Sequence, residues 1–422
     1  MQDRVSSSVA RSRVAVIGGG IAGISAAHYL QKVCDVTLYE ASPQLGGHAY
    51  PVEISEDETT FFVDTAFMVF NRRSYPLFMR LLGDLGIESE VQFAEMSFSI
   101  FHESNKMGFA LNRGLQGLFH QKRNIFRLSF YFQLVELFRF RNAVFRDLVE
   151  GLLSGSLREY LGSYSSGFID NLLLPIATAV WSIPADQVLD LPVETLARFL
   201  MNHGYLRGHP GHQWRTLRGS SYTYLKAFEK NFKGTVRLNS KVAALIRTPN
   251  GIHVLSKNET FYDDVVLAVP GDQALRLIGS PTEDETTLLS NWKYTKTKLT
   301  LHKDASVLRT PRKLWSSWNI LNKERGALSV TYYLNRVQDL KVKRDYFVTL
   351  GAGLTIDPAQ IVFQKEFSHP VFTSSSVSTQ KRLAEINGAN RTYFCGSYLG
   401  FGFHEDAVFS AIEVAKLFGA PC

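Results

Sequence analysis

The sequence lacks a long hydrophobic run. Its 422 residues contain no stretch of about 18 consecutive apolar residues, so we expect no membrane-spanning helix. The opening residues, MQDRVSSSVARSR, also lack the apolar core of a secretory signal, and we interpret them as a short frayed tail. Both absences argue against an integral membrane protein.

Cysteine is scarce. Cys34, Cys395 and Cys422 are the only three, they lack metal-ligand spacing, and they are too few for a disulfide framework. The reducing cytoplasm is therefore the compartment that we expect. Three histidines share a loop that contains glycine and proline, and these are His203, His209 and His212. This loop has no carboxylate and no helical spacing, so we predict no metal site.

The net charge of +7 is not accompanied by a basic helix or a recognised nucleic-acid motif, so we expect no nucleic-acid partner. Apolar residues make up 45% of the chain and charged residues 20%, which is typical of a globular protein. A chain of 422 residues is too long for one simple core, and we expect two closely associated lobes.

A complete βαβ unit is present near the N-terminus, in RVAVIGGGIAGISAAHYLQKVCDVTLYEAS. A β-branched strand is followed by Gly18-x-Gly20-x-x-Gly23, by an alanine-rich helix and by a second strand. Gly18 suits the tight turn, Gly20 lets the backbone approach a pyrophosphate, and Gly23 permits close packing of helix on strand. The amides at the helix start, at Ile21 and Ala22, hold phosphate charge. The motif predicts a dinucleotide-binding site.

The second strand ends at Glu40, about twenty residues after Gly20. A carboxylate at this position accepts hydrogen bonds from a ribose diol and repels a 2′-phosphate. Immediately afterwards, ASPQLGGHAY contains Gly46 and Gly47. Such a pair lets the chain fold back along a flavin cofactor, although a plain turn is the alternative.

Several motifs together resemble the flavin-containing amine oxidoreductase superfamily, which includes phytoene desaturases and protoporphyrinogen oxidases. They are the βαβ unit, LGGHAY, VDTAFMVFNRRSYP and FCGSYLGFGFHED. Within it, the sequence is most similar to flavin-binding proteins like the N-terminal half of plant cyclopropane-fatty-acyl-phospholipid synthases. The resemblance implies an α/β fold, in which a Rossmann-like FAD-binding domain of the amine oxidase type is interwoven with an α+β substrate domain. It also implies non-covalent FAD.

The resemblance gives a role to the C-terminal stretch FCGSYLGFGFHEDAVFSA. A strand ends in Gly396 beside the pyrophosphate, and Asp406, Ala407 and Val408 place helix-start amides at the flavin ring. A compatible alternative is that Asp406 caps the helix. Two departures from the family, Tyr398 in place of an acid and Ala407 in place of glycine, weaken the transfer of amine-oxidase chemistry. Cys395, beside Gly396, is interpreted as a packing residue.

The candidate cofactor-binding residues are Gly18, Gly20, Ile21, Ala22, Gly23, Glu40, Ala41, Gly46, Gly47, His48, Val242, Gly396, Asp406, Ala407 and Val408. Of these, Val242 is implied by the family, in which its counterpart meets the adenine. The FAD-binding domain is expected at 1–75, 215–280 and 388–422, and the substrate domain at 76–214 and 281–387. Within the former we predict a hairpin turn at Asn250-Gly251 and a buried parallel strand from Val265 to Val269.

The segment HQKRNIFRLSFYFQLVELFRFRNAVFRDLVEGLL interleaves arginine with phenylalanine from His120 onward. One interpretation is a helix lying in a bilayer interface, where rings and guanidinium groups match the headgroup level. The other is a core helix of the substrate domain with a solvated basic face. The sequence does not distinguish them.

Candidate catalytic residues are fewer. Superfamily oxidases often hold a water near flavin N5 with a lysine at the position of Lys298, and a desolvated lysine can transfer protons. Lys296, Lys298 and His302 would share one strand face, and a solvated strand face with a basic stripe is the favoured interpretation of them. His404 is the second candidate, with simple packing as its alternative.

Three functions follow as hypotheses. The first is an FAD-dependent oxidoreductase that oxidises a fatty acyl or other lipid substrate by hydride transfer to flavin N5. The second is an amine oxidase for a small amine. The third is a non-catalytic flavin-bound partner of a lipid methyltransferase. For the first we expect a cytoplasmic protein with peripheral contact to the inner face of a membrane.

Overall fold

The structure of the chain is a computed structural model that describes residues 11–104, 106–111, 117–119, 121–181, 183–206, 213–323, 328–351 and 354–422. The expected N-terminal tail lies largely outside these residues. The chain divides into two compact units. Unit 1 comprises residues 1–47, 225–291 and 379–422, and unit 2 comprises residues 48–224 and 292–378.

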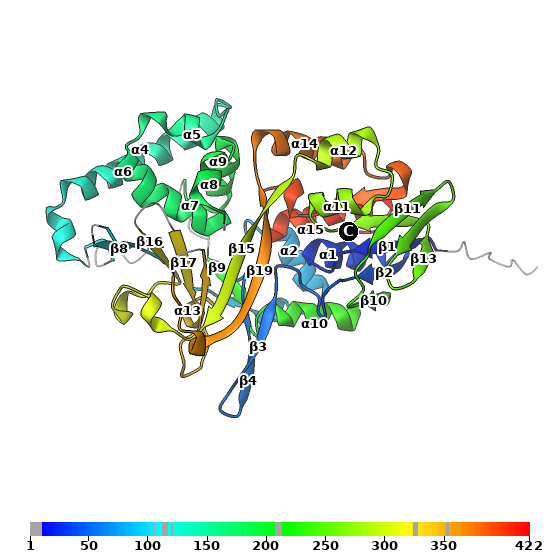
Figure 1. The fold of residues 1–422 in the computed structure, drawn as a ribbon, viewed down its shortest axis with the longest axis horizontal. Helices are drawn as coiled ribbons and strands as arrows, with labels where there is room; N and C mark the ends of the chain where they lie inside the picture. Colours follow the sequence, from blue (N-terminus) through cyan, green and yellow to red (C-terminus); the bar gives the residue numbers. More distant parts are fainter. Residues whose placement is uncertain are drawn as a thin grey trace, which may run out of the picture. The chain divides into compact units, whose positions relative to one another are not determined.

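Unit 1 contains a five-stranded parallel sheet (Figure 1). Its order is β10 (Thr235–Arg237), β2 (Asp35–Tyr39), β1 (Arg13–Ile17), β14 (Asp264–Leu267) and β20 (Thr392–Phe394). Ile17 pairs with Tyr39 on one side and Leu267 on the other, so the carboxyl ends of the central strands lie level. This confirms the predicted Rossmann-like α/β fold. The buried parallel strand predicted from Val265 to Val269 is present as β14, which ends at Leu267.

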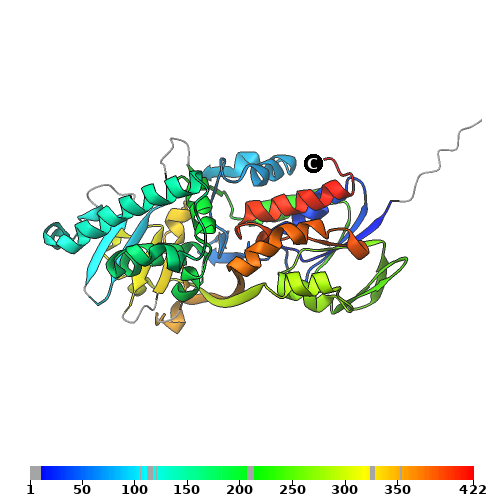
Figure 2. The same ribbon diagram turned by 90° about the horizontal axis from the view of Figure 1, so that it is seen from above.

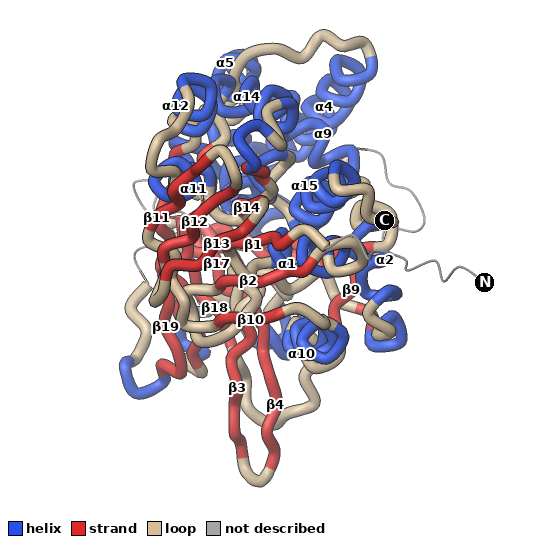
Figure 3. Tube along the Cα trace, turned by 90° about the vertical axis from the view of Figure 1, so that its right-hand side faces the viewer, coloured by secondary structure: helices blue, strands red, loops and turns tan. Residues whose placement is uncertain are grey.

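Helices of unit 1 pack beside this sheet. Figure 3 shows α1 (Ile21–Leu30) next to α15 (His404–Leu417), and the two helices are in contact. The others are α11 (Gly271–Leu277) and α12 (Glu283–Leu289), while α10 (Tyr222–Asn231) and α14 (Ser374–Glu385) begin in the last residues of unit 2. Every residue of α1 is buried, because its small side chains allow neighbours to approach closely.

Unit 1 also contains a small antiparallel sheet, in which the turn predicted at Asn250-Gly251 lies one residue earlier. It consists of β11 (Ala244–Thr248), β12 (Gly251–Leu255) and β13 (Glu259–Tyr262). Thr248 pairs with Gly251, so the turn residues are Pro249 and Asn250, not the predicted Asn250-Gly251. Gly251 is needed for packing instead, because a Cβ there would collide with Phe261 and the carbonyl oxygen of Tyr262.

Unit 2 is built on a seven-stranded sheet. Its order is β19 (Ile361–Val371), β15 (Lys293–His302), β18 (Phe347–Leu350), β17 (Leu328–Tyr333), β16 (Trp318–Asn322), β7 (Phe98–His102) and β8 (Met107–Leu111). Only β16 and β7 pair in parallel. The unit also contains the hairpin β3 (Pro51–Glu56) and β4 (Thr59–Asp64), and the small sheet of β5 (Phe70–Asn71), β9 (Trp214–Leu217) and β6 (Val91–Phe93).

The helices of unit 2 include the longest of the described part of the chain, α4 (Leu128–Val149), drawn in teal in Figure 2. The others are α2 (Pro76–Asp84), α5 (Leu157–Tyr160), α6 (Ser166–Phe168), a π-helical turn (Ile169–Leu173), α7 (Leu174–Trp181), α8 (Ala185–Leu189), α9 (Val193–Asn202) and α13 (Leu334–Val337). Short 3-10 turns occupy Glu88–Glu90, Lys122–Phe126, Leu161–Ser163, Ala305–Val307, Arg312–Leu314, Pro358–Gln360, Ala389–Arg391 and Ser397–Leu399. Among the described residues, no helix has both the length and the hydropathy to cross a bilayer.

The unit boundaries differ from the predicted domain boundaries. Residues 48–75 were expected with the cofactor domain but belong to unit 2, where the Asp64 carboxylate accepts hydrogen bonds from Ser221 and Gln338. The segment 215–224 was also expected with the cofactor domain, and it belongs to unit 2 because Ser221 binds Asp64. Residues 281–291 instead belong to unit 1, because Glu285 of α12 forms a 2.6 Å ion pair with Arg247 of β11.

Candidate cofactor-binding site

The glycine turn after β1 gives each glycine a separate role. Gly18 has a φ of +109° and donates its N–H to the Tyr39 carbonyl oxygen at 2.8 Å, and a Cβ on it would collide with the Ala268 carbonyl. A Cβ on Gly23 would collide with the Gly18 carbonyl, so Gly23 serves close packing. Beside Gly20 the nearest atom is the Gly47 Cα, at 3.8 Å from a built Cβ. This open position is where a pyrophosphate can approach the backbone.

The start of α1 supplies the donors for that phosphate. The helix begins at Ile21, and the Ile24 N–H donates to the Gly20 carbonyl oxygen at 2.9 Å. The preceding amides, at Ile21, Ala22 and Gly23, have no acceptor within the helix because of helix geometry. The helix dipole adds positive potential at the same end. The residues present therefore fit an anionic pyrophosphate.

Glu40 lies at the end of β2, beside the turn. One carboxylate oxygen accepts the Gly19 N–H and the other accepts the Ser42 N–H, both at 2.7 Å. Each oxygen has two acceptor sites, so the carboxylate retains capacity for a ribose diol. Ala41 follows and is exposed. Ser240 N–H donates to the Glu40 carbonyl oxygen at 2.8 Å, which holds the loop leading to the buried Val242 beside Glu40.

The pair Gly46 and Gly47 returns to the glycine turn. Their φ angles are +122° and +61°, and Gly46 N–H donates to the Gly19 carbonyl oxygen at 2.8 Å. Gly46 also forms a parallel bridge with Gly20. This arrangement favours the fold-back interpretation over a plain turn. His48 is the first residue of unit 2, and its contact with the cofactor stays a prediction.

The C-terminal turn of unit 1 is held by side chains that the sequence analysis missed. The Ser410 hydroxyl accepts the Gly396 N–H at 2.9 Å and donates to the Ala407 carbonyl oxygen. The Gln380 amide donates to the carbonyl oxygens of Tyr398 and Gly400, at 2.9 and 2.6 Å. The sequence contained a signal for Ser410, because helical spacing places it one turn after Ala407. Gln380 carried no sequence signal.

The start of α15 confirms the capping role of Asp406. Its carboxylate accepts the Phe403 N–H at 2.8 Å, as the third residue of a capping box does. Burial raises the pKa of Asp406 to about 6. Ala407 and Val408 are buried in the same turn, and Ala407 N–H donates to the Phe403 carbonyl oxygen at 3.2 Å. Contact of these three residues with a flavin stays a prediction.

Two further residues near this turn have defined environments. Cys395 is fully buried, and burial raises the pKa of its thiol to about 12. The thiol form is then dominant, and it is a poor nucleophile, which favours the packing role. His404, the first residue of α15, is also buried. Its catalytic role stays a prediction.

Lys298 lies in unit 2 on β15, where it is exposed and pairs in register with Glu366 of β19. The catalytic role of Lys298 stays a prediction. Lys296 is exposed as well, whereas His302 on the same strand is buried and contacts the Thr349 hydroxyl at 2.8 Å. Along this predicted face the side chains are therefore exposed at Lys296 and Lys298 and buried at His302.

A buried carboxylate in unit 2 also escaped the sequence analysis. Asp64 is 2% exposed and accepts the Ser221 N–H at 2.9 Å, the Ser221 hydroxyl, and the Gln338 amide at 3.1 Å. Burial raises its pKa to about 7, against the lowering effect of the Ser221 hydrogen bonds. The network joins β4 to the start of α10 and the end of α13.

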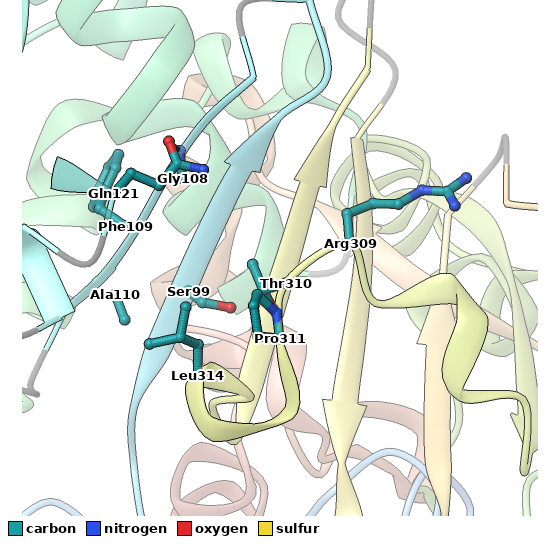
Figure 4. Close-up of a pocket in the computed structure, with 9 residues that line it drawn as sticks. All are labelled: Ser99, Gly108, Phe109, Ala110, Gln121, Arg309, Thr310, Pro311 and Leu314. Atoms are coloured by element: carbon teal, nitrogen blue, oxygen red, sulfur yellow. Dashed lines mark hydrogen bonds between the residues drawn. The ribbon is translucent and has the colours of Figure 1, made fainter. Parts of the chain in front are cut away.

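Other candidate features of unit 2 are small or already packed. Figure 4 shows a cavity of about 30 Å³ lined by Ser99, Gly108, Phe109, Ala110, Gln121, Arg309, Thr310, Pro311 and Leu314. It has room for water but not for an organic substrate. The described residues contain no group of three His, Cys, Asp or Glu side chains suited to a metal. His203 stacks on Trp214, while His209 and His212 lie outside the described residues.

Known proteins share parts of this chain. A family model described as flavin containing amine oxidoreductase matches residues 21–316. Carotenoid phi-ring synthase of Streptomyces griseus is 48% identical over 67 residues, which are 15% of this chain and 13% of that protein. The structure of a CLA-producing fatty acid isomerase from P. acnes has a TM-score of 0.69 at 14% identity, covering 96% of this chain and 99% of that one. Cyclohexylamine oxidase from Brevibacterium oxydans IH-35A has a TM-score of 0.67 at 12% identity, covering 97% and 98%.

The sequence identities to the solved structures are low, so the similarity to them shows the fold alone. The family model covers more than half of the chain, from α1 to the residues before β16. The glycine turn, the α1 amides and the Glu40 carboxylate fit the pyrophosphate and ribose of FAD. The chain therefore belongs to the flavin containing amine oxidoreductase family and is an FAD-dependent oxidoreductase.

Proposed function

We propose that this oxidoreductase acts on a hydrophobic substrate with an anionic end, of which a fatty acyl chain is the best example. The observation that carries the proposal is an aromatic strip in unit 2. It comprises His48, Tyr50, Phe363, Phe367 and His369. The strip begins one residue after Gly47, where the segment expected to follow the cofactor ends.

The rings of the strip contact one another in sequence. The His48 ring centroid is 5.1 Å from those of both Phe367 and His369. Tyr50 stacks on Phe363 at 5.5 Å. Residues 363, 365, 367 and 369 share one face of β19, because side chains alternate along a strand. A continuous row of rings is suited to an extended apolar chain.

A cation interrupts the strip. The Lys365 ammonium lies 3.6 Å from the Tyr50 ring centroid and 5.6 Å from that of Phe367. A positive charge in an aromatic environment repels an ammonium substrate and attracts a carboxylate or phosphate. The strip thus favours an acyl substrate with an anionic end over a small amine.

A buried carboxylate that faced the substrate would support the competing hypothesis, oxidation of an amine. Asp64 is enclosed by Ser221 and Gln338, and Asp406 caps α15. Both carboxylates are already used within the protein. The fold similarity to cyclohexylamine oxidase keeps this hypothesis as the explicit alternative in the test.

Within the proposal, bound FAD would supply the redox chemistry, which is acceptance of a hydride from a substrate C–H bond while a neighbouring carbon loses a proton, with dioxygen or another external acceptor as the final oxidant. The amides of Ile21 and Ala22 and the carboxylate of Glu40 hold the pyrophosphate and ribose. The aromatic strip orients the chain and excludes water. Lys365 fixes the anionic end.

The test is anaerobic mixing of the purified holoprotein with free unsaturated fatty acids, their methyl esters, phospholipids and simple amines such as cyclohexylamine, followed by visible flavin absorbance. We expect acyl substrates to bleach the flavin and amines to leave it unchanged. Bleaching by an amine, with no response to any acyl substrate, would reject the proposal in favour of amine oxidation.

Lys365→Gln separates the charge from the apolar contacts. Loss of one cation near an anionic group should weaken binding of the free acid about fivefold, while the uncharged methyl ester should be unaffected. Lys296→Gln is the matched control, because Lys296 is exposed on the neighbouring strand and its nearest carboxylate oxygen, on Glu366, is 3.9 Å away. Equal effects of both variants would contradict the role of Lys365.

A further inference from the structure

The outer face of α4 is apolar where solvent-facing helices are usually polar. Large apolar side chains of this helix and of the turn before it are exposed, among them Phe126 (85%), Leu128 (76%), Phe132 (68%), Val135 (63%) and Phe138 (59%). Residues 128, 132 and 135 follow helical spacing, so they lie along one face. Clustered exposed rings on one helix mark an interaction surface rather than scattered surface residues.

The opposite face of α4 is already packed. Phe130, Gln133, Phe140 and Val144 are its buried residues, and the helix contacts α6 and α9. Phe140 packs on Phe168 at 5.7 Å. The interpretation of this segment as a core helix whose exposed face is basic therefore fails for Phe126, Phe132 and Phe138, which are exposed. These rings point away from the core of unit 2.

The exposed face also carries charge of a single sign. Between residues 122 and 149, all of which the structure describes, the exposed charged residues are Lys122, Arg123, Arg139 and Arg146. The acidic residues of this stretch, Glu136 and Asp147, are half-buried and accept hydrogen bonds from Ser165 and Tyr160. Asp147 also forms a 2.7 Å ion pair with Arg146, so Lys122, Arg123 and Arg139 contribute most of the positive charge. Exposed rings and cations together match the acyl boundary and the anionic headgroups of a bilayer.

We propose that this face, which we call the α4 face, docks the protein on membranes that contain anionic lipids. The α4 face consists of the exposed residues from Lys122 to Val149. A second copy of the chain is a poorer occupant, because a two-fold contact would place these cations against their own copies. The proposal concerns where the protein binds and is independent of which substrate it oxidises.

The experiment is flotation of the full-length holoprotein with vesicles of phosphatidylcholine that contain a rising share of phosphatidylglycerol. We expect the protein to float, with a fraction that increases with the anionic share. Added salt should reduce binding without abolishing it, since salt screens the cations but not the inserted rings. Protein that stays in the bottom fraction at every lipid composition would overturn the proposal.

Variants identify the face. Phe126→Ser with Phe132→Ser should lower partitioning roughly tenfold or more, because each removes an apolar side chain from the interface. Arg123→Gln with Arg139→Gln should lower it about fivefold per charge and flatten its dependence on salt. Phe93→Ser is the matched control, because Phe93 is 58% exposed on β6, which pairs with β9 and is not part of the α4 face. It should float like the wild type.

Two measurements separate membrane docking from misfolding and from protein–protein contact. Thermal unfolding and flavin content of the α4 variants should equal those of the wild type, since the substituted side chains are exposed. Light scattering decides between a bilayer and a protein occupant. A wild-type dimer that dissociates in the Phe132→Ser variant, or unchanged flotation of the α4 variants, would contradict membrane docking.

Discussion

Two helices, α1 and α4, differ in what covers them although both are rich in apolar residues. All ten residues of α1 are buried, whereas only four of the 22 residues of α4 are. Half of the residues of α1 are glycine, alanine or serine, so neighbouring elements can approach its backbone closely. Those of α4 are large rings and arginines on an exposed face. Apolar content alone therefore does not indicate a core helix; side-chain size and the intervening charges separate the two.

The largest expected effect comes from adding one methyl group at the turn before α1. Gly18→Ala forces a side chain into a φ of +109° and against the Ala268 carbonyl. We expect a loss of roughly 3 kcal/mol or more in unfolding free energy, with loss of flavin. Gly419→Ala is the control, because Gly419 has a φ of +72° with open space around it. It should cost only about 1–2 kcal/mol, and an equal cost at both sites would contradict the packing argument.

Substitution of one apolar residue by serine in each helix tests the comparison of α1 with α4 most directly. Ile24→Ser in α1 places a hydroxyl in a fully buried site and should cost about 2–4 kcal/mol. Phe132→Ser in α4 should change stability by less than about 0.5 kcal/mol. Urea unfolding of both variants measures the difference. Comparable destabilisation would mean that the α4 face is covered in the protein.

The pKa of Asp64 tests how well unit 2 is packed away from the exposed face of α4. A loosely packed unit would leave this carboxylate with an ordinary pKa. The folded-state pKa of about 7 lies above the unfolded value of about 4, so the folded protein holds a proton that the unfolded chain releases. This contribution to stability is full below about pH 4 and is lost as the pH rises to about 7.

Asp64→Asn should abolish that trend. We expect the unfolding free energy of the wild type, relative to this variant, to fall between about pH 4 and 7. Asp57→Asn, an exposed carboxylate at the tip of the same hairpin, controls for the loss of one charge. A wild-type-minus-variant difference that stays flat across this window would contradict the enclosed carboxylate.

A smaller effect is expected at the ligand edge of unit 1. Glu40→Arg should weaken FAD binding by roughly 1–3 kcal/mol, because it removes charge-assisted hydrogen bonds to the ribose. Titration of the apoprotein with FAD measures it, and Glu53→Arg, an exposed residue of β3, is the control. Unchanged FAD affinity would mean that Glu40 is not the ribose ligand.

The sequence predicted the parts of the fold that depend on local spacing. The glycine turn, Glu40 and the strand after Asp264 follow from short motifs, and all belong to the Rossmann-like sheet. The predicted domain boundaries differ at their edges from those of the two units, because contacts such as that of Asp64 with Ser221 join residues 157 positions apart. Gln380 was missed because its partners are backbone carbonyls. The exposure of α4 was left open, since its pattern suits either a core helix or an interface helix.

The central claim is that unit 1 holds a dissociable FAD over the start of α1. Acid precipitation of the purified protein, followed by chromatography of the supernatant, tests it most directly. We expect one intact FAD per chain in the supernatant and a colourless pellet, because the buried Cys395 thiol does not bond to the flavin. Flavin that remains attached to the polypeptide, or a supernatant that contains a nicotinamide dinucleotide in its place, would contradict it.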